Sequence, residues 1–199
     1  MSDQKIHLNF SIKEIFELVP SLAAEVLKYS PLASEISDIY KGTSFTFAIQ
    51  IDDEIYNVVI NDGRNFQTGC GDLKNAMIRF KTGMKDLEEL IVVKNAYMFL
   101  GTSLSLGENE RGRMSSMAEK LNAINGTIHI ELTNDNQSIS KFSVSINKAE
   151  ATQVTIKLSI GDFREMLSGS INPINLFMSG RLKLEGDIGL GLALQGLLF

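Results

Sequence analysis

One order of sequence elements occurs twice in this chain of 199 residues, and this repetition limits the folds open to it more than any other feature. In each copy, apolar and polar residues alternate with the period of half-buried strands. A short amphipathic helical segment follows, at residues 86–91 in the first copy and 162–167 in the second. Next come an apolar run and a short strand containing Ser, Gly and Leu, at residues 101–109 and 179–187. Agreement of successive elements in type and order indicates two divergent repeats.

The repeats divide the chain into three segments. Before them, Ser11 and Glu14 have the spacing of a helix capping box, and Pro20 and Pro31 separate further helical patterns. We therefore predict N-terminal helices in residues 1–41, a degenerate first repeat in residues 42–122 and a second repeat in residues 123–199. The pattern leaves open whether the two repeats fuse into one domain.

The strands are predicted from runs in which every second residue is apolar. These runs are residues 45–51, 56–60, 78–82, 128–132, 142–146 and 154–160. The acidic residues 52–54 supply the turn of a hairpin between the first two strands. After the third strand of each repeat, we predict Asp86 and Asp162 as helix N-caps, with Glu89 and Glu165 at the N3 position. Capping explains these carboxylate pairs more simply than acid–base catalysis does.

Composition excludes several classes of function. The formal net charge of −5 disfavours roles that depend on attracting nucleic acid or anionic lipid headgroups. The single cysteine, Cys70, excludes an internal disulfide framework and favours a reducing compartment. The N-terminal residues lack the apolar core of a secretory signal, and no apolar run approaches the roughly 20 residues of a membrane-spanning helix. We expect a soluble, cytoplasmic protein that binds no nucleic acid and does not insert stably into membranes.

The second repeat carries a more specific pattern, which consists of Asn172-Pro173, the run FMSGRLKLEGD at residues 177–187 and an apolar tail at residues 188–199. This pattern resembles the sterol carrier protein type-2 family, in which a helical segment leads into a Ser/Thr-Gly-Lys-Leu-Lys strand, then Gly-Asp, then an apolar closing helix. Arg181 stands where the family has Lys. The first repeat matches less well, because Thr102 and Ser103 replace the Gly-Arg pair.

The resemblance implies an α+β fold with a mostly antiparallel sheet and helices packed on one face. It also implies an apolar tunnel that accepts fatty acyl chains, sterols or phospholipids, with binding and transfer but no catalysis and no cofactor. The apolar tail is the segment most suited to a tunnel wall, since Gly189, Gly191 and Gly196 each weaken a helix by about 1 kcal/mol relative to Ala. A plain buried core helix is the alternative reading of this tail. The predicted ligand-binding residues are Phe177, Met178, Leu182, Leu184, Ile188, Leu192, Leu194 and Leu198.

No motif of an autonomous enzyme accompanies this pattern. The sequence lacks a phosphate-binding loop, a nucleophile elbow and a zinc-protease motif, and the glycines at 186, 189 and 191 have the wrong spacing for a dinucleotide site. His129 alternates with apolar neighbours and is expected on the outer face of a strand. We expect a non-enzyme without catalytic or metal-binding residues. Two alternatives stay open: a closed-core interaction or homodimerisation module, and an accessory subunit that presents a lipid to an enzyme. The sequence does not name the lipid.

Overall fold

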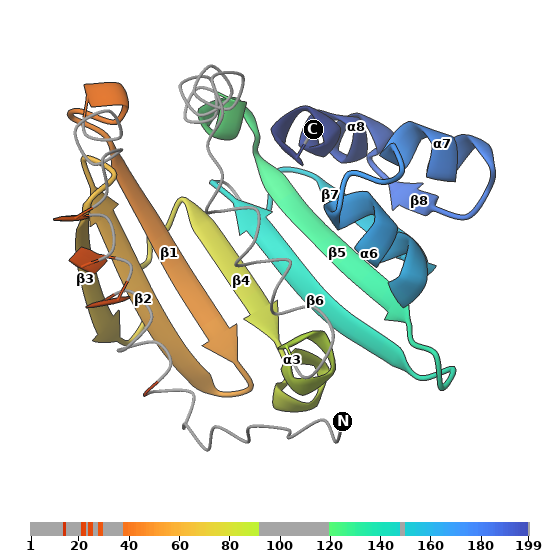
Figure 1. Cartoon of the computed structure of the whole chain (residues 1–199), viewed down its shortest axis with the longest axis horizontal. Helices are drawn as coiled ribbons and strands as arrows, with labels where there is room; N and C mark the ends of the chain where they lie inside the picture. The colour runs from red at the N-terminus through yellow and green to blue at the C-terminus, as the bar shows by residue number, and fades with distance from the viewer. Residues whose placement is uncertain are drawn as a thin grey trace.

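Strands from both halves of the chain join in one curved eight-stranded sheet (Figure 1). The strands are β1 (Ser44–Ile51), β2 (Glu54–Asn61), β3 (Asn65–Cys70), β4 (Ile78–Thr82), β5 (Gly126–Thr133), β6 (Ile139–Ile146), β7 (Gln153–Ser159) and β8 (Lys183–Gly186). Their order across the sheet is β3-β2-β1-β4-β6-β5-β7-β8. The structure is a computed structural model that describes residues 38–91, 120–147 and 150–198, with residues 14, 21–22, 24–25 and 28–29 nearer the N-terminus.

The first half of the sheet is built on the predicted hairpin. β1 and β2 pair antiparallel around a tight turn in which Asp52 adopts a φ of 50°. The third predicted strand, β4, lies parallel to β1. β3 pairs antiparallel with the far side of β2, and the sequence patterns did not predict it. Its sequence, NFQTGC, has one large apolar residue and is mostly exposed. The strand therefore forms because it pairs with β2, and it has no apolar alternation that the sequence would show.

The second half also contains a hairpin and a strand parallel to its first strand. β5 and β6 form an antiparallel hairpin, and β7 lies parallel to β5. β8 pairs antiparallel with the outer side of β7, and an antiparallel pairing of β4 with β6 joins the two halves. In both halves, the strand that runs parallel to the first strand of the hairpin is followed by a helix. The predicted α+β architecture is confirmed.

The pleat of the sheet separates an apolar face from a polar one. Successive side chains of a strand point to opposite faces, and the registers place Ile128, Val144 and Phe80 on the same face. The opposite face carries ion pairs between neighbouring strands, Lys141 with Glu131 at 2.8 Å and Lys157 with Glu185 at 2.7 Å. His129 lies on this polar face between Ser143 and Thr155, as its alternation predicted.

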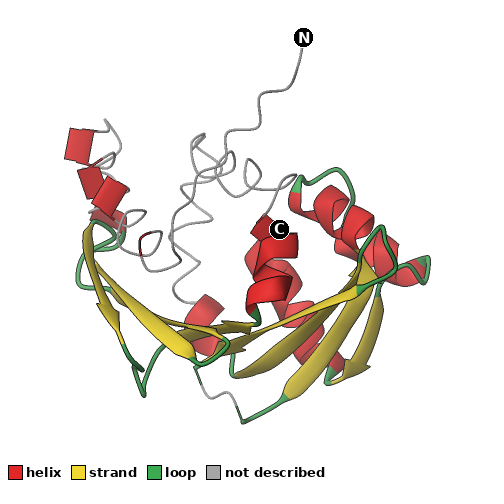
Figure 2. Cartoon of the chain, turned by 90° about the horizontal axis from the view of Figure 1, so that it is seen from below, coloured by secondary structure: helices red, strands yellow, loops and turns green. Residues whose placement is uncertain are grey.

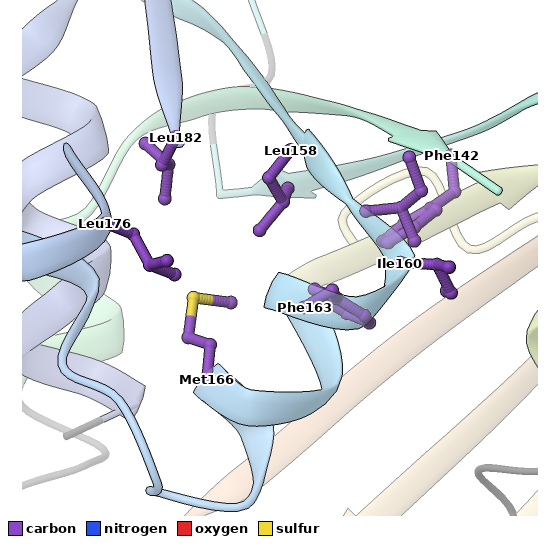
Figure 3. Close-up of a cluster of buried hydrophobic side chains, with 8 residues drawn as sticks. Phe142, Leu158, Ile160, Phe163, Met166, Leu176 and Leu182 are labelled. Atoms are coloured by element: carbon purple, nitrogen blue, oxygen red, sulfur yellow. The ribbon is translucent and has the colours of Figure 1, made fainter. Parts of the chain in front are cut away.

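The described helices lie on the apolar, concave side of the sheet (Figure 2). They are α3 (Met84–Ile91), α6 (Ile160–Leu167), α7 (Pro173–Met178) and α8 (Ile188–Leu198). α3 contacts β6, whereas α6 and α8 contact β5 and β7. Two clusters of buried side chains result. The first joins α6 and α7 to the sheet and is drawn in Figure 3, and the second joins α8 to the sheet through Leu190.

The predicted caps at Asp86 and Asp162 are wrong. α6 begins at Ile160, and the Ser159 hydroxyl accepts a hydrogen bond from the Asp162 amide, which makes Ser159 the N-cap. α3 begins at Met84, whose amide donates to the carboxylate of Asp52 in the neighbouring hairpin turn. The Ser159 hydroxyl and the Asp52 carboxylate each accept an amide of the first helical turn, and Asp86 and Asp162 lie inside their helices.

Several predictions fall outside the described residues. These are most of the N-terminal helices and the parts of the first repeat between residues 92 and 119. In the part of the chain that the structure does describe, no helix has both the length and the apolar character needed to cross a membrane.

Candidate functional site

The two core clusters meet at a seam of three side chains that are not fully buried. Ile130, Ile156 and Leu184 pack against both clusters and are each half-buried. They lie side by side, because Ile130 is in register with Ile156 and Ile156 is in register with Leu184. The seam, defined here as these three residues, is therefore an accessible apolar strip on the concave face between α6–α7 and α8.

α7 borders the seam and is held by one deeply buried residue. The Asn172 side chain caps this helix by accepting the Ile174 amide, and Pro173 provides the preset backbone angle of the first turn. Leu176 is 0% exposed and packs with Met166 and Leu182 (Figure 3). Burial of such a side chain stabilises the fold by about 1.5–3 kcal/mol, so Leu176 fixes α7 against the sheet.

The Gly-Asp pair at the end of β8 sets the position of α8. Gly186 has a φ of 102°, and a Cβ there would lie 2.5 Å from the Gln153 carbonyl oxygen, so the turn requires glycine. The Asp187 side chain then accepts the Leu190 amide at 2.9 Å and caps α8. Leu190, 7% exposed, anchors the helix on the second cluster.

Gly191 brings α8 close to the seam. A Cβ at this position would lie 3.2 Å from a methyl carbon of Leu184 and 3.6 Å from one of Val154. This helical glycine, which the sequence marks as destabilising, therefore permits a close approach of α8 to β8 and β7. The sequence pattern showed the glycine but not the neighbour that it accommodates.

An ion-pair cluster ties α6 to the turn before β8. The Arg181 guanidinium donates to the carboxylates of Asp162 and Glu165, the latter at 3.2 Å. Asp162 is 7% exposed, and its hydrogen bond raises the pKa of Arg181 above its ordinary value. Arg181, which stands where the related motif has Lys, thus holds the strand motif against α6, a role that the sequence alone did not indicate. Both hydrogen bonds come from one guanidinium nitrogen, Nη2.

The eight predicted ligand-binding residues are divided between the interior and the surface. Leu182 is 6% exposed within the first cluster, and Leu184 belongs to the seam. Four others are exposed apolar side chains on α7 and α8, and they are Phe177 (40%), Met178 (79%), Ile188 (49%) and Leu192 (51%). The backbones of Leu194 and Leu198 lie in α8, and their side chains fall outside the described part. Ligand contact by these residues stays a prediction.

The sequence analysis missed Ile130 and Ile156. The alternation of apolar and polar residues in β5 and β7 places both side chains on the apolar face of the sheet. Many other apolar residues alternate in the same way. Only the packing of α6, α7 and α8 leaves these two half-buried. A separate open pocket of about 500 Å³ is lined by polar and small residues, among them Lys74, Arg79 and Asn147. Within the described ranges, no group of three His, Cys, Asp or Glu side chains has the geometry of a metal site.

Residues 108–199 match the model of the SCP-2 sterol transfer family. The chain is 38% identical over 73 residues to hydroxysteroid dehydrogenase-like protein 2 of Xenopus laevis, covering 37% of this chain and 16% of that protein. It is 37% identical over 57 residues to human sterol carrier protein 2, covering 29% and 10%. The chain thus spans less than a fifth of either relative.

Among solved structures, sterol carrier protein 2 from Yarrowia lipolytica is 23% identical and has a TM-score of 0.35. The similarity covers 45% of this chain and 79% of that one.

Proposed function

Because residues 108–199 match the model of the SCP-2 sterol transfer family, we propose that this chain binds an apolar lipid and carries it between sites in the cytoplasm without transforming it. Within those residues, the seam of Ile130, Ile156 and Leu184 offers a strip of accessible apolar surface backed by two packed clusters. This strip is the observation that carries the proposal. Burial of roughly ten methylene groups on it would contribute about 8 kcal/mol before the loss of chain entropy.

We also propose that the sheet derives from two fused copies of one unit. The hairpin β1–β2 with parallel β4 and α3 has the same order and pairing as the hairpin β5–β6 with parallel β7 and α6. The two units differ at one edge. The outer side of β7 pairs with β8, whereas the outer side of β4 pairs with β6 of the other unit. The family-like motif contains β8, which is the outer strand of the second unit.

Native mass spectrometry of the freshly purified chain tests the lipid proposal. We expect an adduct of lipid mass that is lost on denaturation in organic solvent. The Ile156→Thr variant keeps a β-branched shape but adds a hydroxyl to the apolar strip, and burial of an unpaired hydroxyl costs about 1–3 kcal/mol. We expect it to bind lipid about tenfold more weakly. Its matched control is Thr155→Val, a change of similar size on the polar face of the same strand.

Leu192→Asp tests the predicted contribution of α8. Leu192 is 51% exposed, so a charged residue is compatible with the fold. Loss of lipid uptake in a folded variant supports ligand contact by this residue. A chain that stays free of lipid after incubation with fatty acids and sterols contradicts the proposal and favours the interaction module. In that case the mass should shift to a homodimer with rising protein concentration.

A second candidate function is presentation of the bound lipid to an enzyme. The observation that favours it is the match to hydroxysteroid dehydrogenase-like protein 2, because 84% of that protein lies outside the match of 16% and its name refers to a dehydrogenase. An enzyme that consumes the bound lipid should then co-purify with the tagged chain and convert the protein-bound lipid faster than the free lipid. Equal rates for the two forms contradict presentation.

A further inference from the structure

The half-buried apolar surface does not stop at the edge of the family-matched half. In the next row of the concave face, Val144 of β6 is in register with Phe80 of β4, and Phe80 is in register with Ile49 of β1. All three are half-buried, like the seam residues. Val144 and Ile130 also pack against the same cluster, so the seam and this row form one surface.

A neighbouring row on β4 and β1 is also apolar and half-buried. Ile78 of β4 is in register with Phe47 of β1, and both are half-buried on the concave face. The charged and amide side chains of the same strands, Lys81 and Gln50, are in register with each other on the opposite face. No charged side chain therefore interrupts the rows of β6, β4 and β1 described above.

The dimensions of this surface exceed those of one ordinary lipid tail. Neighbouring strands lie about 4.8 Å apart, so the four strands from β8 to β6 span about 14 Å. A bilayer core of about 30 Å holds two opposed tails, which gives about 15 Å for each. The inclusion of β4 and β1 lengthens the surface to about 24 Å.

We propose that β4 and β1 extend the ligand site, so that this protein takes linear hydrocarbon chains longer than one membrane acyl tail. This inference rests on the proposed lipid-binding function and assigns a role to the half of the chain that the family model does not match. The chain lies across the strands, over the seam, then over Val144, Phe80 and Ile49. A flexible chain can follow this surface, because the sheet is curved and a flat bilayer does not reach along its concave face (Figure 2).

A series of single-chain fatty acids tests the proposal, with lengths from shorter to longer than a membrane tail. Each additional buried methylene raises affinity by up to about fourfold. We expect the affinity of the unmodified chain to keep rising beyond the length of one tail. The double variant Phe47→Thr, Ile49→Thr should bind the longest chains at least about tenfold more weakly and the short chains almost unchanged. Val59→Thr is the matched control, a half-buried residue on the opposite face of the adjoining strand.

Photo-crosslinking provides a second measurement that does not depend on how the variants fold. Fatty acids with a diazirine at the terminal methyl are bound to the unmodified chain and crosslinked by light. Long chains should label peptides that contain β1 or β4, and short chains should label only peptides of the second half. An affinity that levels off at one tail length, or identical labelling by long and short chains, overturns the extension and leaves lipid binding intact. Absence of binding at every length overturns the proposed function itself.

Discussion

The inward side of α7 provides the sharpest test of how the site is held. Leu176→Ala removes a side chain that is 0% exposed and packed against Met166 and Leu182. Buried Leu→Ala changes cost about 2.7–5.0 kcal/mol, depending on how far the surroundings collapse into the cavity. The flexible Met166 can fill part of the space, so we expect about 3 kcal/mol. In a chain of 199 residues this corresponds to a decrease in Tm of about 6–12 °C.

The adjacent residue supplies the control. Phe177 is larger than Leu176 but 40% exposed, so Phe177→Ala should cost about 1 kcal/mol. Urea unfolding followed by circular dichroism measures the free energy of unfolding of both variants against the unmodified chain. Equal losses in the two variants would refute the assignment of an inward and an outward side to α7, and so would a loss below 1 kcal/mol for Leu176→Ala.

Three further predictions concern the backbone, a helix cap and pH. Gly126→Ala should lower the free energy of unfolding in urea by about 3 kcal/mol, because φ is 149° and the new Cβ would lie 2.6 Å from the Thr152 carbonyl oxygen. An unchanged free energy of unfolding would contradict this geometry. Asp187→Ala should cost about 1 kcal/mol by loss of the α8 cap, whereas Asp187→Asn should retain most of it. The hydrogen bond from Lys141 lowers the pKa of Glu131, so this carboxylate stabilises the fold at neutral pH and loses that effect as the pH falls through the lowered value. Glu131→Gln should therefore cost up to about 1 kcal/mol at pH 7, a difference that disappears in acid and shrinks in high salt, and a constant difference would contradict this account.

The predicted ligand-binding residues differ in burial in a way that the sequence did not indicate. Leu182 and Met178 belong to the same family-like motif and are both apolar, yet one is 6% and the other 79% exposed. A motif shows which residue types follow one another but not which side of a six-residue helix meets the sheet. The contact of Leu176 with the first cluster decides that orientation.

The helix caps illustrate the same limit at short range. The Asp-x-x-Glu spacing at residues 162–165 matches a capping box, but Ser159 occupies the capping position and Asp162 pairs with Arg181. Arg181 lies far along the chain from Asp162, so no local pattern contains this pair. The Ser159 hydroxyl and the Arg181 guanidinium together outweigh the capping pattern at residues 162–165.

The sequence by itself determined the elements whose signal is local. Period-two runs predicted six strands, the acidic turn predicted the β1–β2 hairpin, and alternation placed His129 on the polar face, because side-chain direction in a strand depends only on the backbone. Tertiary structure alone decided that β4 pairs with β6 to make one sheet, and that Ile130, Ile156 and Leu184 stay half-buried between two clusters. Partial burial is a property of the space that the helices leave over the sheet. That space depends on contacts between residues distant in sequence, which no periodicity records.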